Sequence, residues 1–334
     1  MKPILNVIFC ANFPLYRTGV LSTATGLLAH MPNVSLRLYS NQKFTLLGYE
    51  MIPLEALECD IKQQYLIFSH VESSTLKELV VKIPHAFIHV GDWPVIAWRR
   101  TLSNGNIIKA SLGILRFYYR IRNLSKLLKF IFVNDEDTVS AIKYGFVNSL
   151  TVPIGVNAPN VSINNTINFN KICFSGNFNF PPNLDAAKIL LLWARDNLNY
   201  SVMLVGYGAG LLHNLISSPN VFLHDSVSSI VDFLAIQRPI YVSLLRFGAG
   251  SKNKILEAMI SGCPVIATPE SLEPYFDGFN SIITIKNVKE LGIALEQIAA
   301  NHEISQKVEQ SFIKIMNERS WKNASNMLLD AIHG

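Results

Sequence analysis

The residues best suited to chemistry lie in one segment, 247–268, which reads FGAGSKNKILEAMISGCPVIAT. Glycines at its start let the backbone approach a ligand closely, and a serine follows as a candidate helix N-cap. Two lysines stand beside the helix start, where free N–H groups already favour an anion. A glutamate follows about two turns into an otherwise apolar helix. The pattern predicts a nucleotide site, with a diphosphate at the helix start and ribose hydroxyls at the carboxylate. The candidate residues are Gly248, Gly250, Ser251, Lys252, Lys254 and Glu257.

The elements around this segment alternate between strand and helix. Gly262 and Pro264 end the helix, and a buried strand begins at Val265. Strands are expected at 4–11, 34–39, 64–69, 86–90, 130–134, 171–175, 201–206, 221–223 and 240–244, and helices at 22–30, 136–144, 183–196, 228–235, 288–300 and 321–332. This alternation predicts parallel sheets in an α/β fold.

The length of 334 residues allows two domains of about 150 residues each. A polar stretch at 160–170 is the expected linker. We expect an N-terminal domain over 1–157, a second domain over 158–318 and a C-terminal helix over 319–334 that packs back toward the first domain.

The cysteine pattern and the hydropathy indicate the cellular compartment in which the protein works. The four cysteines include no CxxC pair, which argues against a zinc site and a disulfide framework and favours a reducing environment. No apolar run reaches the roughly 20 residues of a membrane span. We therefore expect a cytoplasmic protein.

The segment at 247–268 resembles the G-x-G-x-x-x-K-x-x-E-A-M-x-x-G-x-P-V signature of GT-B glycosyltransferases, close to glycosyltransferase family 4. The resemblance covers residues 130–334 well and the N-terminal part loosely. It implies two Rossmann-like domains that face an interdomain cleft, with the nucleotide-sugar donor bound by the C-terminal domain and the acceptor by the N-terminal one. It also implies that Glu257 binds the ribose hydroxyls and that Lys252 or Lys254 binds the diphosphate. The resemblance further implies retention at the anomeric carbon. It also implies that no metal ion or other cofactor is bound, since the helix dipole and the lysines would stabilise the departing diphosphate.

Two further glycine segments fit this site. Gly176 follows the first strand of the second half, in FSGNFNFPPNLDA, which resembles the G-x-x-x-x-P-N-x-D-A opening of the donor domain in a family 4 subset. Carboxyl ends of parallel strands are where open α/β sheets bind ligands. Gly206 and Gly208 match a V-G-x-G segment after the next strand, and we expect them to line the nucleotide site.

The chain departs from the family pattern at two places. Many relatives carry an arginine and a lysine where this chain has Asn177 and Asn183. Arg246, beside the lysines, is expected to replace that charge, although it could equally be a surface strand end. Ala249 stands where many relatives carry the first acid of an E-x7-E pair, which leaves the contact to the donor sugar open.

Acceptor-side candidates lie in the first half. His89 and Asp92 fall in FIHVGDW, at an expected strand end, and resemble the H-D segment of relatives. Asp92 could act as a base or orient the acceptor hydroxyl, and His89 could contact the donor sugar or phosphate, with a purely structural histidine as the alternative. Gly19 matches the glycine loop that borders the acceptor site, and Arg17 in that loop could contact a phosphate or could be simply solvated.

A basic, aromatic stretch runs from 93 to 134 without an acidic residue. Its residues 116–129 carry basic side chains at helical spacing against apolar ones. Such a helix can lie on an anionic bilayer, where each basic residue adds roughly 1 kcal/mol. We expect residues 98–130 to contact an anionic membrane surface; a nucleic-acid patch and a solvated helix face are the alternatives, and no nucleic-acid partner is expected.

These observations predict a metal-independent glycosyltransferase at the inner face of the cell membrane. It would move a sugar from a UDP-, GDP- or dTDP-linked donor to a glycan or lipid-linked acceptor, in cell-surface polysaccharide or glycolipid synthesis. A nucleotide-sugar epimerase of the same fold is one alternative. A non-catalytic nucleotide-sugar binder or partner subunit is the other, because of Ala249 and the missing loop charges.

Overall fold

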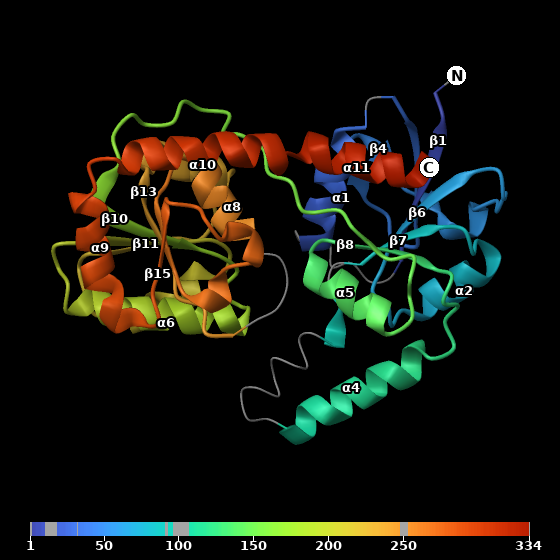
Figure 1. Cartoon of the computed structure of the whole chain (residues 1–334), viewed down its shortest axis with the longest axis horizontal. Coiled ribbons are helices and arrows are strands. Elements are labelled where there is room, and N and C mark those ends of the chain that lie inside the picture. Colours follow the sequence, from blue (N-terminus) through green and yellow to red (C-terminus); the bar gives the residue numbers. More distant parts are fainter. Residues whose placement is uncertain are drawn as a thin grey trace. The chain divides into compact units, whose positions relative to one another are not determined.

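The computed structural model describes residues 2–10, 19–31, 33–90, 93–95, 107–247 and 253–333. The chain divides into two compact units (Figure 1). The N-terminal unit holds residues 1–155 together with 319–334, and the C-terminal unit holds the described residues between 156 and 318.

The N-terminal unit is built on a seven-stranded sheet with the order β5-β2-β1-β6-β7-β8-β9. Its strands are β1 (Ile4–Phe9), β2 (Ser35–Ser40), β5 (Ile52–Pro53), β6 (Gln64–Phe68), β7 (Phe87–His89), β8 (Lys129–Phe132) and β9 (Leu150–Thr151). Every pairing in it is parallel. Along β1, Ile8 joins one core cluster while Val7 and Phe9 join another. Both faces of the sheet are therefore covered, which is why β1 is apolar at every position except Asn6.

The helices of this unit are α1 (Gly19–Ala29), α2 (Ser74–Lys82), α4 (Ile107–Ile121), α5 (Asp135–Lys143) and α11 (Trp321–His333), and a short antiparallel pair, β3 (Thr45–Leu46) and β4 (Tyr49–Glu50), lies outside the main sheet. Among the described residues, none of the helices combines the length and the hydropathy that a membrane span requires.

Helix α11 completes the N-terminal unit although it ends the chain. It packs on α1, where the Ser325 hydroxyl donates a 2.6 Å hydrogen bond to the Leu27 carbonyl. The buried Trp321 ring lies directly on Gly26, because a side-chain carbon at that glycine would come within 2.3–2.6 Å of the indole. The close approach of α1 and α11 thus depends on glycine at this position.

The C-terminal unit has a six-stranded sheet with the order β12-β11-β10-β13-β14-β15, also parallel throughout its pairings. Its strands are β10 (Asn168–Ser175), β11 (Ser201–Val205), β12 (Val221–His224), β13 (Pro239–Ser243), β14 (Val265–Ala267) and β15 (Ile282–Thr284), and its helices are α6 (Pro181–Arg195), α7 (Ile230–Gln237), α8 (Asn253–Ile260), α9 (Leu291–Ala300) and α10 (Ile304–Glu318). The strand order runs outward from β10 in one direction and from β13 in the other. The carboxyl ends of β10 and β13 are therefore the topological switch point, where open α/β sheets bind ligands.

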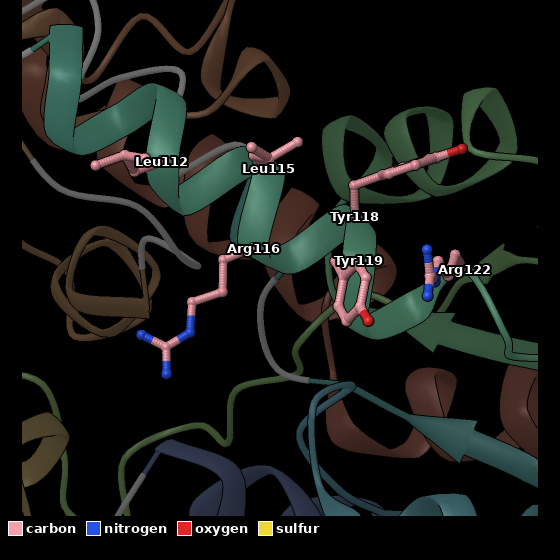
Figure 2. Close-up of a pocket in the computed structure, with 6 residues that line it drawn as sticks. All are labelled: Leu112, Leu115, Arg116, Tyr118, Tyr119 and Arg122. Atoms are coloured by element: carbon pink, nitrogen blue, oxygen red, sulfur yellow. The ribbon is translucent and has the colours of Figure 1, made fainter.

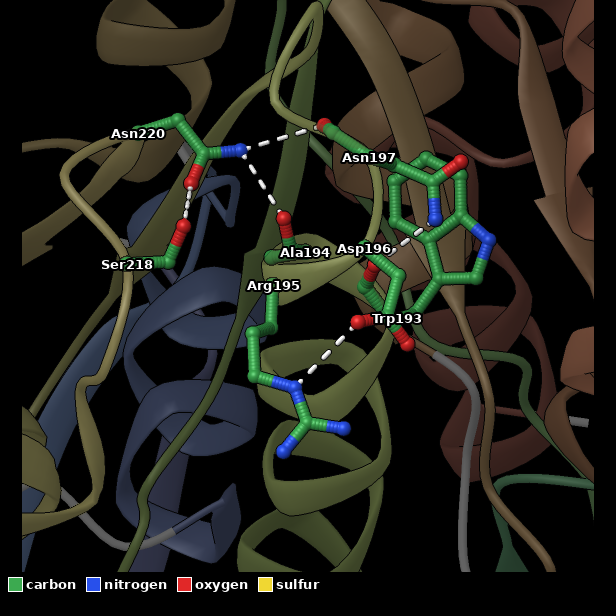
Figure 3. A network of polar contacts seen from close by, with 7 residues as sticks. All are labelled: Trp193, Ala194, Arg195, Asp196, Asn197, Ser218 and Asn220. Atoms are coloured by element: carbon green, nitrogen blue, oxygen red, sulfur yellow. Dashed lines mark hydrogen bonds and ion pairs between the residues drawn. The ribbon is translucent and has the colours of Figure 1, made fainter.

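Helix α6 is fixed at its C-terminal end by one asparagine (Figure 3). The side-chain amide of Asn220 donates to the carbonyls of Ala194, Asn197 and Tyr200 at 3.2, 3.2 and 2.7 Å, and the Ser218 hydroxyl donates to the Asn220 side-chain oxygen. These bonds join the last turn of α6, at Ala194, to the turn that follows the helix, at Asn197 and Tyr200. The network holds α6 in place, and the first turn of α6 faces the strand ends described next.

Candidate functional site

The loops after β10 and β11 touch each other through glycines. The Gly176 amide donates to the Val205 carbonyl at 2.9 Å, and the Phe178 amide donates to the Tyr207 carbonyl at 2.9 Å. A side-chain carbon at Gly206 would lie only 2.1 Å from the Gly176 carbonyl oxygen, and Gly206 has a φ of +135°. Both the space and the backbone conformation require glycine there. The two loops therefore pack backbone against backbone at the switch point.

Lys254 lies against the loop after β10. It belongs to the first turn of α8, and its Cε would be 3.0 Å from a side-chain carbon at Gly176. The Asn183 amide lies beside the same glycine, at 2.9 Å from that position, and donates to the Asn177 carbonyl at 2.9 Å. The structure thus brings together Gly176 and Lys254, which are 78 residues apart in the sequence (254 − 176).

Gly208 adopts the left-handed conformation, with a φ of +80°. A side-chain carbon there would come within 2.9 Å of the Asn179 amide nitrogen. Gly208 therefore keeps the β11 loop close to the β10 loop on the side that carries Asn179.

Glu257 follows Lys254 by three residues on α8, a spacing at which helix side chains are neighbours. It is half-buried, and no described residue donates a hydrogen bond to its carboxylate. Burial raises the pKa of Glu257 to about 7, against the opposing effect of the Lys254 charge. Burial likewise lowers the pKa of Lys254, while the Glu257 charge acts to raise it. Within the described part of the chain, the carboxylate is therefore a hydrogen-bond acceptor without a partner.

The buried hydroxyl of Tyr241 on β13 supports this position. It contacts the Ser175 hydroxyl at the end of β10 at 2.9 Å. Burial raises the pKa of Tyr241, and the Glu257 charge adds to that rise. The Glu257 charge is therefore close enough to act on the Tyr241 hydroxyl on β13.

Arg246 follows β13 and is paired. Its Nε donates to Asp185 Oδ2 at 2.8 Å and its Nη2 to Asp185 Oδ1 at 2.5 Å. Asp185 lies in the first part of α6, so the pair joins α6 to the segment that leads into residues 248–252. The pair is neutral as a unit. The predicted role of Arg246 as a cation for the site stays a prediction, and the structure adds Asp185 as its partner.

The N-terminal unit places His89 at the end of β7 with no solvent exposure. Neither ring nitrogen has a hydrogen-bond partner among the described residues, and the same holds for the Trp93 indole nitrogen. Burial lowers the pKa of His89 to about 4, so the ring is neutral at pH 7. Gly19 begins α1, the helix that follows β1. Because β1, β6 and β7 are parallel neighbours, their carboxyl ends lie at one edge of the sheet.

Several predicted site residues fall outside the described residues, and their roles stay predictions. These are Arg17, Asp92, Gly248, Gly250, Ser251 and Lys252.

Helix α4 carries an exposed apolar and aromatic face (Figure 2). Leu112, Leu115, Tyr118 and Tyr119 are 54–64% exposed. Together with Arg116 and Arg122 they line a shallow hollow of about 600 Å³. The opposite side of the helix is buried through residues such as Phe117 and Ile121, which anchors α4 to its unit.

The basic residues around α4 divide into two groups. The Arg122 guanidinium lies 3.8 Å from the centre of the Tyr119 ring, and Arg116 is exposed. Arg120 instead forms a 3.0 Å ion pair with Glu72, and Lys126 donates a 2.8 Å hydrogen bond to the Tyr144 carbonyl. The expectation of helical spacing over 116–129 was wrong beyond Ile121, because turns at 122–128 lead into β8.

Sequence reasoning missed three polar residues of this region, Ser175, Asp185 and Tyr241. Asp185 could have been nominated from the sequence, since it is the aspartate of the P-N-x-D-A segment. Tyr241 and Ser175 lie within apolar strand patterns, and no sequence signal distinguishes their hydroxyls from ordinary buried ones. In the described part of the chain, no group of three or more histidine, cysteine or acidic side chains is arranged to hold a metal ion.

Comparison with known proteins bears on both units. Residues 170–301 match the family model described as Glycosyl transferases group 1. Among solved structures, the chain is similar to sucrose-phosphate synthase from Thermosynechococcus elongatus, with a TM-score of 0.67, 11% identity and 98% of each chain covered. It is also similar to Anabaena HepE in complex with UDP and glucose, with a TM-score of 0.64, 11% identity and both chains covered in full. For S. aureus TarM the TM-score is 0.60 and the identity 14%, over 84% of this chain and 57% of TarM. The search of curated proteins gave no match.

At these identities the solved structures establish the fold, and the family match is confined to the C-terminal unit. The predicted α/β fold of the GT-B type is confirmed. The predicted enzyme class is confirmed at the level of the group 1 domain.

Proposed function

Since this chain is a GT-B protein that carries a group 1 glycosyltransferase domain, we propose that it transfers a sugar from a nucleoside-diphosphate sugar to an acceptor hydroxyl. One observation carries the proposal. Gly176 and Gly206 let the loops after β10 and β11 pack tightly at the switch point, and α8 places Lys254 against Gly176, with Glu257 three residues further along the same helix.

The chemistry of the two α8 side chains fits the two ends of a nucleoside diphosphate. Lys254 packs closely against the loop after β10 because Gly176 has no side chain, and its ammonium group can meet an anion there. An anion there would also restore the charge balance that burial disturbs at the lysine. Glu257 offers unpaired carboxylate oxygens to the vicinal hydroxyls of a ribose. UDP is the first nucleotide to test, because HepE is described in complexes with UDP and with UDP-glucose.

The leaving diphosphate needs stabilisation as the glycosidic bond breaks. In this proposal Lys254, Lys252 and the N–H groups at the start of α8 supply it without a metal ion, because preorganised donors at a developing charge lower the barrier. Retention at the anomeric carbon belongs to the same proposal.

The N-terminal unit would bind the acceptor. Asp92 would orient or deprotonate its hydroxyl, and Arg17 and Gly19 would border it. The His89 ring is buried and neutral. It would therefore act as a hydrogen-bonding partner and not as a cation.

We place the enzyme at the inner face of the cell membrane, in polysaccharide or glycolipid synthesis. The exposed face of α4 supports this location. Its leucines and tyrosines would enter the boundary between headgroups and acyl chains, and Arg116 and Arg122 would meet anionic headgroups.

Donor turnover tests the proposal. Thermal shift with UDP-, GDP- and dTDP-linked sugars identifies the donor, and release of nucleoside diphosphate is then measured with and without glycan or lipid-linked acceptors. We expect release that depends on the acceptor. Conversion of the donor alone would instead identify an epimerase. Binding without either reaction would identify a non-catalytic subunit, the alternative that Ala249 and the missing loop charges motivate.

A further inference from the structure

The ion pair between Arg246 and Asp185 has a more closely defined geometry than an exposed ion pair usually has. Two roughly parallel N–H···O bonds of 2.8 and 2.5 Å join the guanidinium to the carboxylate. The Arg246 side chain is nevertheless 63% exposed and that of Asp185 24%. Exposed ion pairs contribute little to stability. A bidentate arginine–carboxylate pair is the arrangement that best keeps such an exposed side chain in one geometry.

The backbone that carries Arg246 is fixed as well. The Leu245 amide donates to the Ser271 hydroxyl at 3.2 Å, and the Thr268 hydroxyl donates to the Leu245 carbonyl at 2.5 Å. Ser271 also donates to the Ser243 carbonyl at 3.0 Å, inside a buried cluster of hydroxyls. The hydroxyl cluster thus fixes the backbone at Leu245, directly before Arg246, and Asp185 fixes the Arg246 guanidinium.

The helix that supplies Asp185 also organises the glycine loops. Asn183, two residues earlier in the first turn of α6, donates to the Asn177 carbonyl and lies beside Gly176. One helix end therefore contacts both the loop after β10 and the residue that precedes the 248–252 segment. An arginine held at this place lies next to the region in which we propose that the diphosphate binds.

We propose that Asp185 is a positioning residue for the diphosphate of the donor, acting through Arg246. Asp185 occupies the Nε proton and one Nη2 proton of the guanidinium. The remaining N–H groups have no acceptor among the described residues, and a guanidinium presents its donors in a rigid fork suited to phosphate oxygens. The inference rests on the proposed donor site.

Asp185 has two opposite effects on an anion, and they can be separated. As a negative charge it repels the diphosphate, so its removal alone would tighten binding. As the partner of Arg246 it removes the cost of ordering a long side chain during binding, which for one such side chain can reach roughly a factor of ten in affinity. The water-exposed surroundings weaken the repulsion more than the ordering effect, so we expect a net loss of affinity when Asp185 is replaced.

The test is calorimetric titration of the full chain with UDP and with uridine, using GDP or dTDP and the matching nucleoside if the wild-type chain prefers one of them. The variants are Asp185→Asn, Arg246→Gln and the double variant. Glu72→Gln is the matched control, since it removes the acid of another exposed arginine pair, at 3.0 Å to Arg120 in the other unit.

We expect Asp185→Asn to raise the Kd for UDP about three- to tenfold and to leave the Kd for uridine unchanged. In the Arg246→Gln background the same substitution should cause no further loss, and Glu72→Gln should have no effect. Unchanged or tighter UDP binding by Asp185→Asn would overturn the proposal, as would an equal loss for UDP and uridine, which indicates a structural role. A wild-type chain that binds none of the three diphosphates would refute the proposed function itself, and this inference with it.

Discussion

Replacement of Glu257 by glutamine should make the protein more stable at pH 8 and worse at binding a nucleoside. Burial raises the pKa of Glu257 from an ordinary value near 4.5 to about 7. The folded state therefore holds the proton more tightly than the unfolded state. Its stabilising effect is fully present below pH 4.5 and is lost as the pH rises through 7.

The size of the effect follows from the change in proton affinity. A change from 4.5 to about 7, at 1.36 kcal/mol for each tenfold change in affinity, gives an upper limit of about 3 kcal/mol. The side chain is only half-buried, and water screens it in part, so we expect about 1–2 kcal/mol. Glutamine keeps the shape and removes the charge. Its free energy of unfolding should stay level from pH 5 to pH 8 while that of the wild type falls.

Urea-induced unfolding of both proteins at pH 5 and pH 8 measures this difference, and Glu296→Gln, an exposed position on α9, is the control. Uridine titration of the same proteins measures the functional side, where the loss should be at least about 1.5 kcal/mol. Uridine is preferred to UDP because it carries no phosphate that titrates in this pH range. Parallel stability profiles of wild type and Glu257→Gln would show that the carboxylate is not buried as argued. Unchanged uridine affinity would remove Glu257 from the site.

Three further predictions concern packing and the surface. Gly206→Ala should lower the free energy of unfolding by more than about 2 kcal/mol in urea titrations, because its Cβ would meet the Gly176 carbonyl at 2.1 Å and its φ is positive; a neutral effect would contradict the contact between the two loops. Trp321→Ala should cost about 3 kcal/mol by the same measurement, since the ring fills the space over α1, and a loss below 1 kcal/mol would contradict that packing. Charge reversal of Arg116 and Arg122 to glutamate should abolish sedimentation with anionic vesicles and leave the weak background with neutral ones unchanged, because both guanidinium groups line the exposed face of α4; undiminished pelleting would exclude this face as the membrane contact.

The sheets could be predicted from the sequence because parallel strands buried on both faces are nearly continuous apolar runs. The expected strand at 4–11 is β1 at 4–9, and the one at 240–244 is β13 at 239–243. The end of α8 was also predictable, since Gly262 has a φ of +74° after the last helical turn. Local sequence fixes these features, and no distant residue is needed to form them.

The helices α2 and α10 were not predicted, and α4 was placed too late in the chain. Residues 116–129 share a basic and apolar character, but the helix ends at Ile121 and Ser125 stabilises a turn by accepting the Leu127 amide at 3.3 Å. Composition alone does not reveal such a break.

The relations within the site required the fold. Arg246 and Asp185 are 61 residues apart in the sequence, and only the adjacency of the β10 and β13 strand ends brings them together. The sequence could therefore nominate Arg246 as a cation for the site, whereas its bidentate carboxylate partner had to come from the structure.

The placement of Lys254 and Glu257 also separates a functional explanation from a structural one. Two half-buried ionisable groups, each with a pKa displaced by burial, lie on a helix whose neighbouring residues are fully buried. Well-packed apolar residues are often at least as stable as a buried ion pair, so packing does not account for them. They lie, however, beside the one place in the sheet where the strand order reverses, near Gly176 and Gly206, where an added side chain would clash. A ligand with a negative group and a set of hydroxyls accounts for both side chains, because it would add an anion beside the lysine and hydrogen-bond donors beside the carboxylate.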